Sequence, residues 1–555
     1  MYPDRTHFKT SDEVDFVIVG SGAAGGVLAK ELSTSGFSVV VLEQGPYLRE
    51  SDFSHDEIKV LREFQLSNDP KSQPNTFRKS STEKAIEQRA VVYGSAVGGT
   101  SNHFAANFWR FLEIDFMERS KVGPVPGSTL VDWPIAYADL EPYYTKVEWE
   151  VGVSGLAGAS PFDPPRSKPY PMPPLPVKSN GVVFERGARK LGLHPFPAPM
   201  AILSQPLAGR SACVNCGFCW GFGCEVKAKS SSLASMIPIA EKTGRCEIRA
   251  NSYVHRIELG SCGRATGAVY FDAKKTAHLQ KAKAVVLAAN GAETPRLLLL
   301  SASKQFPNGL ANSSGLVGKN LMLNSAAVSF GVFEEQLNDY KGFTVSRIIH
   351  DFYELDPQKV GFCGGGGIDA RFDMTPINFA SGQGLPLDTP RWGKKFKDTI
   401  AHNFTRTVKI LSHGTSLPVE TNTITLDSDV KDAWGLPALC MTYKDHPDDL
   451  KLSNFMNQQA LAILDAAGAE QKWGLPVQEQ QLAFAMLGTC RMGTNPKASV
   501  INTDHRAHDV RNLFICDGSS FVTSGRGQPT ETIEALAFRA ADRITDLAKR
   551  GEINS

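Results

Sequence analysis

The sequence predicts an α/β protein in which a Rossmann-like domain carries an inserted α+β domain built on an antiparallel sheet. Three observations support this prediction. An apolar strand over residues 14–19 runs through a glycine-rich turn into a helix and a second strand. A strand over 512–517 and an amphipathic helix over 529–549 lie near the end of the chain. Between these parts, residues 330–480 alternate in the two-residue period of strands.

The turn after the first strand contains three glycines that suit separate tasks. Gly20 allows the tight turn, Gly22 lets the backbone approach a pyrophosphate, and Gly25 lets helix and strand pack closely. The N-terminus of the helix adds partial positive charge. The second strand ends at Glu43, whose carboxylate can accept hydrogen bonds from a ribose. Strand, turn, helix and terminal acid together predict dinucleotide binding.

Length and charge limit the class of protein. A chain of 555 residues exceeds a single simple core, so at least two domains are expected. Its 59 basic and 58 acidic residues give no global field for nucleic acid or an anionic membrane, and no apolar run is long enough for a transmembrane helix. Residues 1–7 lack the pattern of a secretory signal. We therefore expect a cytoplasmic protein, or a periplasmic one if a partner carries the export signal.

The dinucleotide domain is predicted to be discontinuous. It is built from residues 1–115, 205–325 and 485–555, which contain the strand and helix patterns described above. Residues 116–204 are proline-rich and are predicted to form an extended excursion or lid, because proline offers no backbone donor to a sheet. Residues 326–484 are predicted to form the substrate-binding domain.

Four separated motifs resemble those of the glucose–methanol–choline (GMC) oxidoreductases, which bind FAD. Residues 93–103 resemble the flavin-contacting glycine loop of that family, and residues 291–298 resemble its second motif. Residues 318–321 resemble the segment that follows, and the run 488–537 resembles the catalytic segment. The resemblance covers nearly the whole chain. Within the family it is strongest to the gluconate dehydrogenase and pyranose oxidase-like branch, which acts on sugars and related polyols.

The resemblance implies that FAD is the cofactor. Glycines at 94, 98 and 99 would let the backbone lie flat against the ring. Asp517 follows a strand, where its carboxylate can bind ribityl hydroxyls, cap the next helix, or do both. The dipole of the helix after Gln528 can stabilise the anionic reduced flavin. The predicted cofactor-binding residues are Gly20, Gly22, Ala23, Ala24, Gly25, Glu43, Gly94, Gly98, Gly99, Asn102, His103, Val254, Asp517, Gly518, Pro529 and Thr530.

His103 has two alternative roles. The loop that contains it resembles the pyranose oxidase loop, in which the histidine at this place is joined covalently to the flavin 8α-methyl group. A covalent bond would raise the flavin potential and prevent loss of the cofactor. In the alternative, the His103 ring packs beside the isoalloxazine without a bond. The sequence leaves both alternatives open.

The resemblance places the catalytic histidine of the family at a position that is alanine here. Alcohol oxidation by a flavin needs a base for the hydroxyl proton, and a well-placed histidine contributes about 10²–10⁴-fold. That position is Ala485, and the second catalytic position, a histidine or asparagine in the family, is Gln528. Their separation matches the family pattern, so the alignment is not slipped. Gln528 can hydrogen-bond a substrate oxygen but is not a base at neutral pH.

Three explanations of Ala485 stay open. A histidine could have been replaced, by engineering or by natural inactivation. The chain could use another base, with His103, His505, His508 or Glu531 as candidates. Alternatively, the chain binds flavin without ordinary alcohol oxidation. His505 and His508 lie just before the last strand, where we expect solvated or structural roles.

Four cysteines lie within twelve residues: Cys213, Cys216, Cys219 and Cys224. Their spacing resembles iron–sulfur ligation, and related sugar dehydrogenases use such a cluster to pass electrons onward, although their spacing differs. Structural zinc is a second alternative, and plain thiols or disulfides are a third. The aromatic residues between the cysteines favour a packed loop without metal.

These observations predict an FAD-dependent oxidoreductase that oxidises a hydroxyl of a sugar, sugar acid or glycoside by hydride transfer to flavin N5. Gln528 and the position of Ala485 would lie at the reacting hydroxyl. The alternative is a flavoprotein with non-redox or vestigial activity, either lyase-like or an assembly subunit. The expected partners are the small-molecule substrate and an electron-transfer or small export subunit. Nucleic acid binding and direct membrane insertion are not expected.

Overall fold

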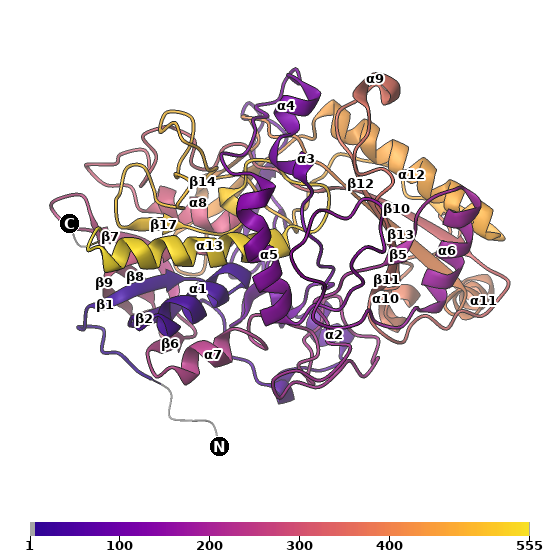
Figure 1. The fold of residues 1–555 in the computed structure, drawn as a ribbon, viewed down its shortest axis with the longest axis horizontal. Coiled ribbons are helices and arrows are strands. Elements are labelled where there is room, and N and C mark those ends of the chain that lie inside the picture. Colours follow the sequence, from indigo (N-terminus) through magenta and orange to yellow (C-terminus); the bar gives the residue numbers. More distant parts are fainter. Residues whose placement is uncertain (1–5, 554–555) are drawn as a thin grey trace.

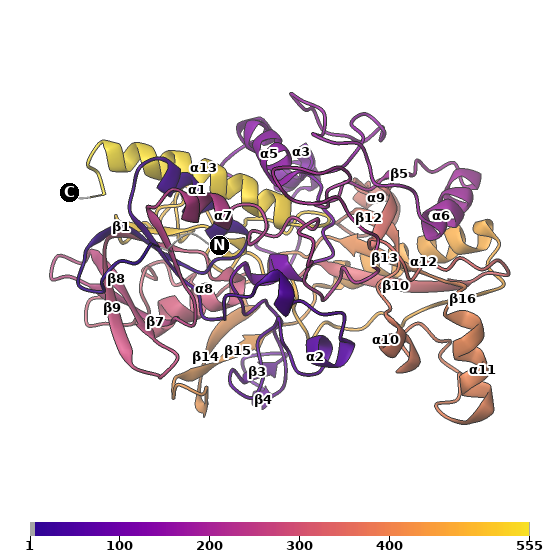
Figure 2. The same ribbon diagram turned by 90° about the horizontal axis from the view of Figure 1, so that it is seen from below.

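The computed structural model describes residues 6–553. Residues 1–5, which belong to the N-terminal segment without a secretory signal pattern, lie outside the described part. In Figure 1 a sheet covered by long helices occupies the left half of the molecule, and a second sheet with its own helices occupies the right half. A third, smaller sheet lies below the first in the view of Figure 2. The sequence-predicted α/β fold is confirmed.

The first sheet has seven strands in the order β6-β2-β1-β9-β8-β7, with β17 paired to β9. The pairs β1–β2, β1–β9, β2–β6 and β9–β17 are parallel, whereas β7–β8 and β8–β9 are antiparallel. The central strands are apolar and buried on both faces, as expected of a parallel sheet between helices. The strands are β1 (Val14–Val19), β2 (Val39–Leu42), β6 (Cys246–Arg249), β7 (Tyr253–Leu259), β8 (Ala265–Phe271), β9 (Ala277–Leu287) and β17 (Leu513–Ile515).

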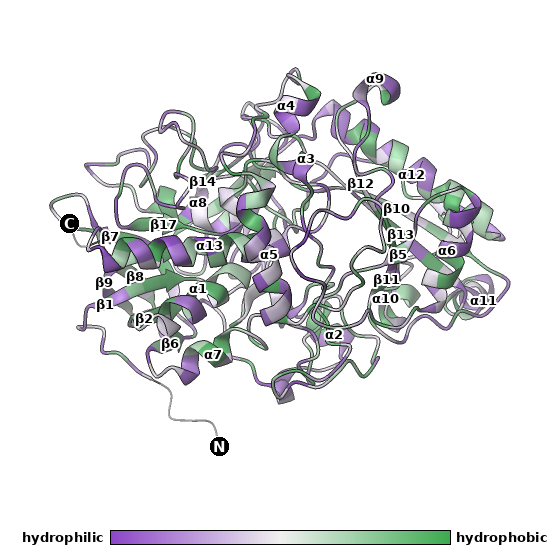
Figure 3. Cartoon of the chain, in the orientation of Figure 1, coloured by the Kyte–Doolittle hydropathy of each residue, from purple (hydrophilic) through white to green (hydrophobic). Residues whose placement is uncertain are grey.

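Helices from distant parts of the chain cover this sheet. The first helix, α1 (Ala23–Thr34), packs against the last, α13 (Thr530–Lys549), and α5 (Tyr137–Val151) packs against α13 in turn (Figure 1). Polar and apolar residues alternate along α13 in Figure 3, in agreement with its one buried face. Two further helices, α7 (Ile237–Lys242) and α8 (Asn290–Leu300), pack against α1 and β7 respectively.

The second sheet has six strands in the order β16-β10-β13-β12-β11-β5, and all its pairs are antiparallel. Helices α6 (Ser179–Lys190) and α12 (Pro447–Ala467) pack on each other and on this sheet (Figure 1). The strands are β5 (Phe196–Pro197), β10 (Ser325–Val332), β11 (Val345–Ile349), β12 (Gly366–Arg371), β13 (Thr407–Gly414) and β16 (Gln471–Gly474).

The third sheet has four strands in the order β14-β15-β3-β4, and α8 contacts β14. Its strands are β3 (Asn75–Arg78), β4 (Ile86–Glu87), β14 (Thr423–Lys431) and β15 (Pro437–Thr442). The remaining helices are short, except for the eleven residues of α11. They are α2 (Glu57–Leu61), α3 (Glu113–Phe116), α4 (Glu118–Val122), α9 (Pro357–Val360), α10 (Pro376–Ala380) and α11 (Gly393–Asn403).

The proline-rich segment 116–204 contributes to both halves of the molecule. Its helix α5 packs on α13 beside the first sheet, whereas α6 and β5 join the second sheet. The domain boundaries given by the sequence stay a prediction. Among the described residues, no helix combines the length and the apolar character that a membrane crossing requires.

Candidate functional site

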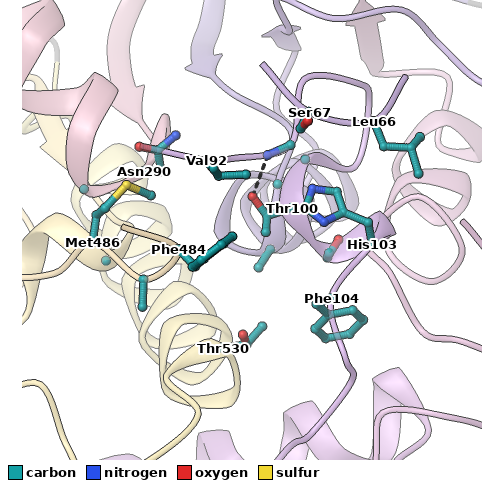
Figure 4. A pocket seen from close by; sticks show the side chains of 18 of the residues that line it. Leu66, Ser67, Val92, Thr100, His103, Phe104, Asn290, Phe484, Met486 and Thr530 are labelled. Atoms are coloured by element: carbon teal, nitrogen blue, oxygen red, sulfur yellow. Dashed lines mark hydrogen bonds between the residues drawn. The ribbon is translucent and has the colours of Figure 1, made fainter. Parts of the chain in front are cut away.

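A cavity of about 800 Å³ lies between the first and second sheets. Its lining comes from the carboxyl ends of β1, β2 and β9, from the glycine loop, from the C-terminal segment, and from β12 and β13. Figure 4 shows His103 and Phe104 on one side of the cavity, with Phe484 and Met486 across from them and Thr530 below. The cavity therefore joins the predicted cofactor region to the predicted substrate domain.

The glycine turn after β1 has the geometry that a dinucleotide needs. Gly20 has a φ of +95°, and a Cβ there would lie 2.5 Å from the Ala288 carbonyl oxygen. A Cβ on Gly25 would lie 2.0 Å from the Gly20 carbonyl oxygen, so helix and strand are in close contact. A Cβ on Gly22 would meet no atom closer than Gly99 Cα at 3.9 Å, although Gly22 lines the cavity. The space in front of Gly22 thus fits a ligand that touches the backbone.

Glu43 is buried at the end of β2 and lines the same cavity. One carboxylate oxygen accepts hydrogen bonds from the Ser21 N–H at 3.1 Å and the Ser21 hydroxyl at 2.7 Å. The other oxygen accepts from Gly45 N–H at 3.0 Å. Burial raises the pKa of Glu43, and these hydrogen bonds oppose that shift. The carboxylate holds the turn in place and presents its remaining lone pairs to the cavity.

The glycine loop combines residues that line the cavity with residues that support it from behind. Gly94 and Gly99 line the cavity, and Gly94 N–H donates to Thr100 Oγ1 at 2.8 Å. Gly98, with a φ of +99°, and Asn102 are not among the lining residues. The Asn102 amide donates to Val97 O at 2.8 Å, so its role is to shape the loop.

His103 is half-buried on the cavity wall, and its buried Nε2 has no hydrogen-bond partner. Burial, together with the nearby Lys229 ammonium, lowers the pKa of His103 to about 4, so the ring is neutral at pH 7. Asn324 Nδ2 is a second unpartnered buried polar atom on a residue that lines the cavity. Buried polar groups without partners are uncommon, so these two atoms point to a bound group.

The C-terminal side of the cavity carries Asp517 and the first residues of α13. Asp517 accepts hydrogen bonds from Asn290 N–H at 3.0 Å, Thr294 Oγ1 at 2.6 Å and Ser519 N–H at 2.8 Å. The carboxylate therefore serves as a cap and also lines the cavity. Helix α13 has no side-chain cap at its N-terminus, which leaves its first N–H groups directed at the cavity. The other predicted cofactor-binding residues that line the cavity are Ala23 and Ala24 of α1, Val254 of β7, and Gly518, Pro529 and Thr530.

Ala485 and Gln528 line the same cavity, as the family pattern implies. Of the four alternative bases, only His103 lines it. His505 Nδ1 bonds to Ile515 O at 3.0 Å, and His508 Nε2 bonds to Ser499 Oγ at 2.9 Å. The structure gives both rings roles that stabilise the loop before β17.

Glu531, the fourth alternative base, is fully buried in α13. Burial and the adjacent Glu148 carboxylate raise its pKa well above the usual range, while Arg110 and Arg166 oppose the shift. This environment favours the protonated carboxyl group, and Glu531 does not line the cavity, so the structure does not place it as the base.

The sequence analysis missed a histidine on the opposite wall. His413, on β13, lines the cavity; its Nε2 lies 2.7 Å from Asp369 Oδ2 on β12 and its Nδ1 lies 3.1 Å from Gln528 Nε2. The register of β12 and β13 brings these groups together. Gly367 pairs with His413, and Asp369 lies two residues further along β12, so its side chain is on the same face of the sheet as His413. One signal was available in the sequence: Asp369 and Arg371 are charged residues in a strand that is otherwise apolar.

The four clustered cysteines line a small separate cavity and carry free thiols. Burial raises the pKa of Cys219 to about 12. Lys229 Nζ donates to Cys219 O at 2.6 Å and to Phe104 O at 3.2 Å, which connects this loop to the glycine loop. Within residues 6–553, the ligand atoms that gather within 4.8 Å are those of His55, Cys216 and Glu225, not of the four thiols. This geometry does not favour one zinc ion held by four cysteines, and the iron–sulfur and thiol alternatives stay predictions.

Comparisons with known proteins agree with the site. Family models described as GMC oxidoreductase match residues 14–326 and 418–537. The 2-methyl-1,2-propanediol dehydrogenase of Mycolicibacterium austroafricanum is 34% identical, over 97% of this chain and 96% of that protein. The gluconate 2-dehydrogenase flavoprotein of Pantoea cypripedii is 28% identical, over 96% and 94%. A formate oxidase from Aspergillus oryzae RIB40, solved to study FAD modification, has the same fold, with a TM-score of 0.68 and 15% identity over 98% of this chain and 100% of that one.

Proposed function

The chain belongs to the GMC oxidoreductase family, as the sequence motifs predicted, and on that premise we propose that it oxidises a hydroxyl of a sugar, sugar acid or glycoside. The family makes it an FAD-dependent oxidoreductase that acts on CH–OH groups. One observation carries the finer proposal. The cavity has a glycine-lined wall suited to a dinucleotide and, facing it, a wall of polar and charged side chains from the second sheet.

The residues of the first wall fit FAD. Gly20, Gly22 and the N-terminus of α1 would hold the pyrophosphate, with Glu43 at the ribose. The free Nε2 of His103 and the uncapped start of α13 would lie against the flavin. When bound, the flavin supplies the two-electron acceptor that takes a hydride from the carbinol carbon.

The second wall suits a substrate with several hydroxyl groups. The charged side chains of this wall form ion pairs. Lys409 Nζ lies 2.7 Å from the Asp373 carboxylate, and Arg371 Nε donates a hydrogen bond to the Asp369 carboxylate. Held charges and amides offer fixed hydrogen-bond donors and acceptors, which recognise hydroxyls by direction. The amide side chains of the cavity lining include Asn378, Gln383, Gln480 and Gln528. The names of the two relatives, which specify a diol and gluconate, support the same class.

Anaerobic mixing tests this function. The holoenzyme is mixed with a panel of sugars, sugar acids and 1,2-diols while the visible flavin band is recorded. At least one substrate is expected to bleach the band, and Gln528→Ala is expected to retain FAD but to slow bleaching. If no compound bleaches the wild type while dithionite does, the redox proposal fails. The lyase-like or assembly-subunit alternative then holds.

The two roles of His103 are separated by acid precipitation. A covalent bond to the 8α-methyl group would leave the flavin in the protein pellet, whereas a packed ring would release it to the supernatant. His103→Ala is the matched variant, because it abolishes retention in the pellet only if the bond forms.

A cluster at the four cysteines, and a partner that receives electrons or assists export, are parts of the same proposal. The contact between the cysteine loop and Phe104 supports a route for electrons from the flavin. Assays of iron and acid-labile sulfide in the purified protein decide this point. Stoichiometric iron and sulfide that are lost in Cys216→Ser would support the cluster. Iron-free protein in which a thiol reagent modifies Cys213, Cys216, Cys219 and Cys224 would contradict it.

A further inference from the structure

We propose that His413, oriented by Asp369, is the base that accepts the substrate hydroxyl proton in this chain, in place of the histidine absent at position 485. The inference rests on the proposed function, because it assigns the proton acceptor of that reaction. It begins from geometry: His413 lies on the substrate wall of the cavity, and Ala485 and Gln528 line the same cavity. Asp369 lies behind His413 and does not reach the cavity.

The hydrogen bonds of His413 define its tautomer. Two groups lie beside Nε2: Asp369 Oδ2, which can only accept, at 2.7 Å, and Arg371 NH2, which can only donate, at 3.0 Å. The carboxylate is the nearer partner, so we assign the ring proton to Nε2. Nδ1 is then the lone-pair nitrogen, and the Gln528 amide nitrogen lies nearer to it, at 3.1 Å, than to Nε2, at 3.4 Å. The basic nitrogen therefore faces Gln528, the residue expected to contact the substrate oxygen. A carboxylate behind one ring nitrogen and a reacting group before the other is the arrangement that orients a general base.

Asp369 is itself fixed. It is fully buried, accepts from the Asn107 amide at 3.1 Å, and pairs with both Arg371 Nε, at 2.6 Å, and Arg371 NH2. The guanidinium and the His413 ring hold the pKa of Asp369 well below its usual range in spite of burial. These contacts favour the ionised carboxylate, which can stabilise a positive charge on His413.

The charges that face His413 set its protonation state. Burial lowers the pKa of His413, and Arg371 and Lys409 add to that shift, whereas Asp369 opposes it. The neighbouring His350 has its pKa lowered to about 3, so it is neutral. Trp109 contacts both imidazoles edge-on, with ring centroids 5.5 and 5.8 Å away. His413 is therefore neutral at pH 7, which is the form that can accept a proton.

The step balances on these residues. The substrate O–H bond breaks and its proton goes to His413 Nδ1, forming an imidazolium beside the Asp369 carboxylate. The substrate C–H bond would break as well, and a bound flavin would supply the acceptor for the hydride with both its electrons. The substrate is left as a carbonyl compound. Gln528 moves its amide from His413 Nδ1 to the substrate oxygen, which frees the lone pair for the proton.

Four proteins test the assignment: wild type, His413→Asn, Ala485→His and the double variant. His413→Asn is expected to slow flavin reduction by about 10²–10⁴-fold, with unchanged FAD content and unchanged bleaching by dithionite. The double variant is expected to recover much of this loss, because the family base is restored. His508→Asn is the matched control, since that ring bonds Ser499 outside the cavity, and it is expected to retain wild-type reduction.

Binding of an inert alcohol gives a readout that does not depend on turnover. A tertiary alcohol carries a hydroxyl but no carbinol hydrogen, so it binds without being oxidised. Its perturbation of the flavin spectrum is expected to depend on pH in the wild type, because protonated His413 can no longer accept a hydrogen bond. The same pH dependence is expected to be absent from His413→Asn.

Each outcome decides the assignment. Wild-type reduction that survives in His413→Asn, or binding whose pH dependence survives, overturns the role of His413 and leaves the proposed function intact. An inert wild type with an active Ala485→His variant also overturns it and shows a site inactivated at position 485. If neither of these proteins is reduced by any alcohol, the proposed function itself fails, and the assignment fails with it.

Discussion

The glycine-lined edge of the first sheet and the polar face of the second sheet form opposite walls of one cavity. The first wall presents mainly backbone atoms, and the second presents side chains. At the first, backbone atoms and helix N-termini make the contacts, and the side chains are mostly absent. At the second, the side chains of His413 and Arg371 line the cavity, and the buried Asp369 carboxylate behind them holds both in place. A binding surface made of backbone atoms depends on glycines at a fixed spacing within a short segment. A binding surface made of side chains depends on the register between strands that are distant in the sequence.

Arg526, which lies two residues before Gln528, gives the largest expected effect, and it tests how the segment that carries Gln528 is held in place. The Arg526 guanidinium is buried and forms ion pairs with Asp115 at 2.7 Å and with Glu118 at 2.8 Å. Arg526→Met would leave two buried carboxylates without their cationic partner, and we expect a loss of about 3–5 kcal/mol in the free energy of unfolding. Chemical denaturation of the holoenzyme measures it. Arg550→Met is the control, because that residue pairs only with exposed Glu552, and a loss of about 1 kcal/mol or less is expected there.

The sequence predicted most of the first region because its signals are local. Strands β1 and β2, helix α13 and the tasks of Gly20 and Gly25 follow from spacing along a few residues. The sequence analysis did not identify α12 as a helix within the substrate domain. It also did not anticipate that β3 and β4 would join β14 and β15 across more than three hundred residues of chain. Such pairings are not encoded in local periodicity.

The histidine on β13 was missed for the same reason. Asp369 and His413 lie on separate strands, and Gln528 precedes the last helix. Sequence reasoning therefore searched for a base near the family motifs. It considered His103, which lines the cavity, and also His505, His508 and Glu531, which do not. Only the pairing of β12 with β13 brings the carboxylate and the imidazole together.

Two glycine variants sharpen the description of the first wall. Gly20 and Gly36 both have positive φ, +95° and +98°, but a Cβ meets Ala288 O at 2.5 Å in the first and nothing within 4 Å in the second. Alanine costs about 1–2 kcal/mol of backbone strain at both positions. Gly20→Ala is expected to cost about 1–3 kcal/mol more, from overpacking, and to lose FAD.

The ratio of flavin to protein absorbance and the unfolding midpoint measure the difference between the two variants. Gly36→Ala should retain FAD. Equal FAD content in both proteins would show that the contact at Ala288 does not set the geometry of the turn.

Asp369→Asn tests the second wall with a smaller effect. Loss of a charged hydrogen bond, worth about 1.5–3 kcal/mol, is expected to slow flavin reduction by roughly ten- to a hundredfold. The pH dependence of the rate gives a second test, because the direction in which it shifts can be predicted. His413 is active when neutral, so the rate falls as pH drops through its pKa, which lies below 6.5. Asp369 opposes that lowering, so the acidic limb should move to still lower pH in Asp369→Asn. If the acidic limb of the pH–rate profile is at the same pH in Asp369→Asn as in the wild type, Asp369 does not influence the pKa of His413.

The most direct measurement is a crystal structure of the holoenzyme with a bound tertiary diol. The account predicts the diol oxygen within about 2.6–3.2 Å of His413 Nδ1, with the carbinol carbon against the flavin and the Gln528 amide on the same oxygen. A diol bound against the flavin with its hydroxyl directed at Ala485 and away from His413 would contradict it.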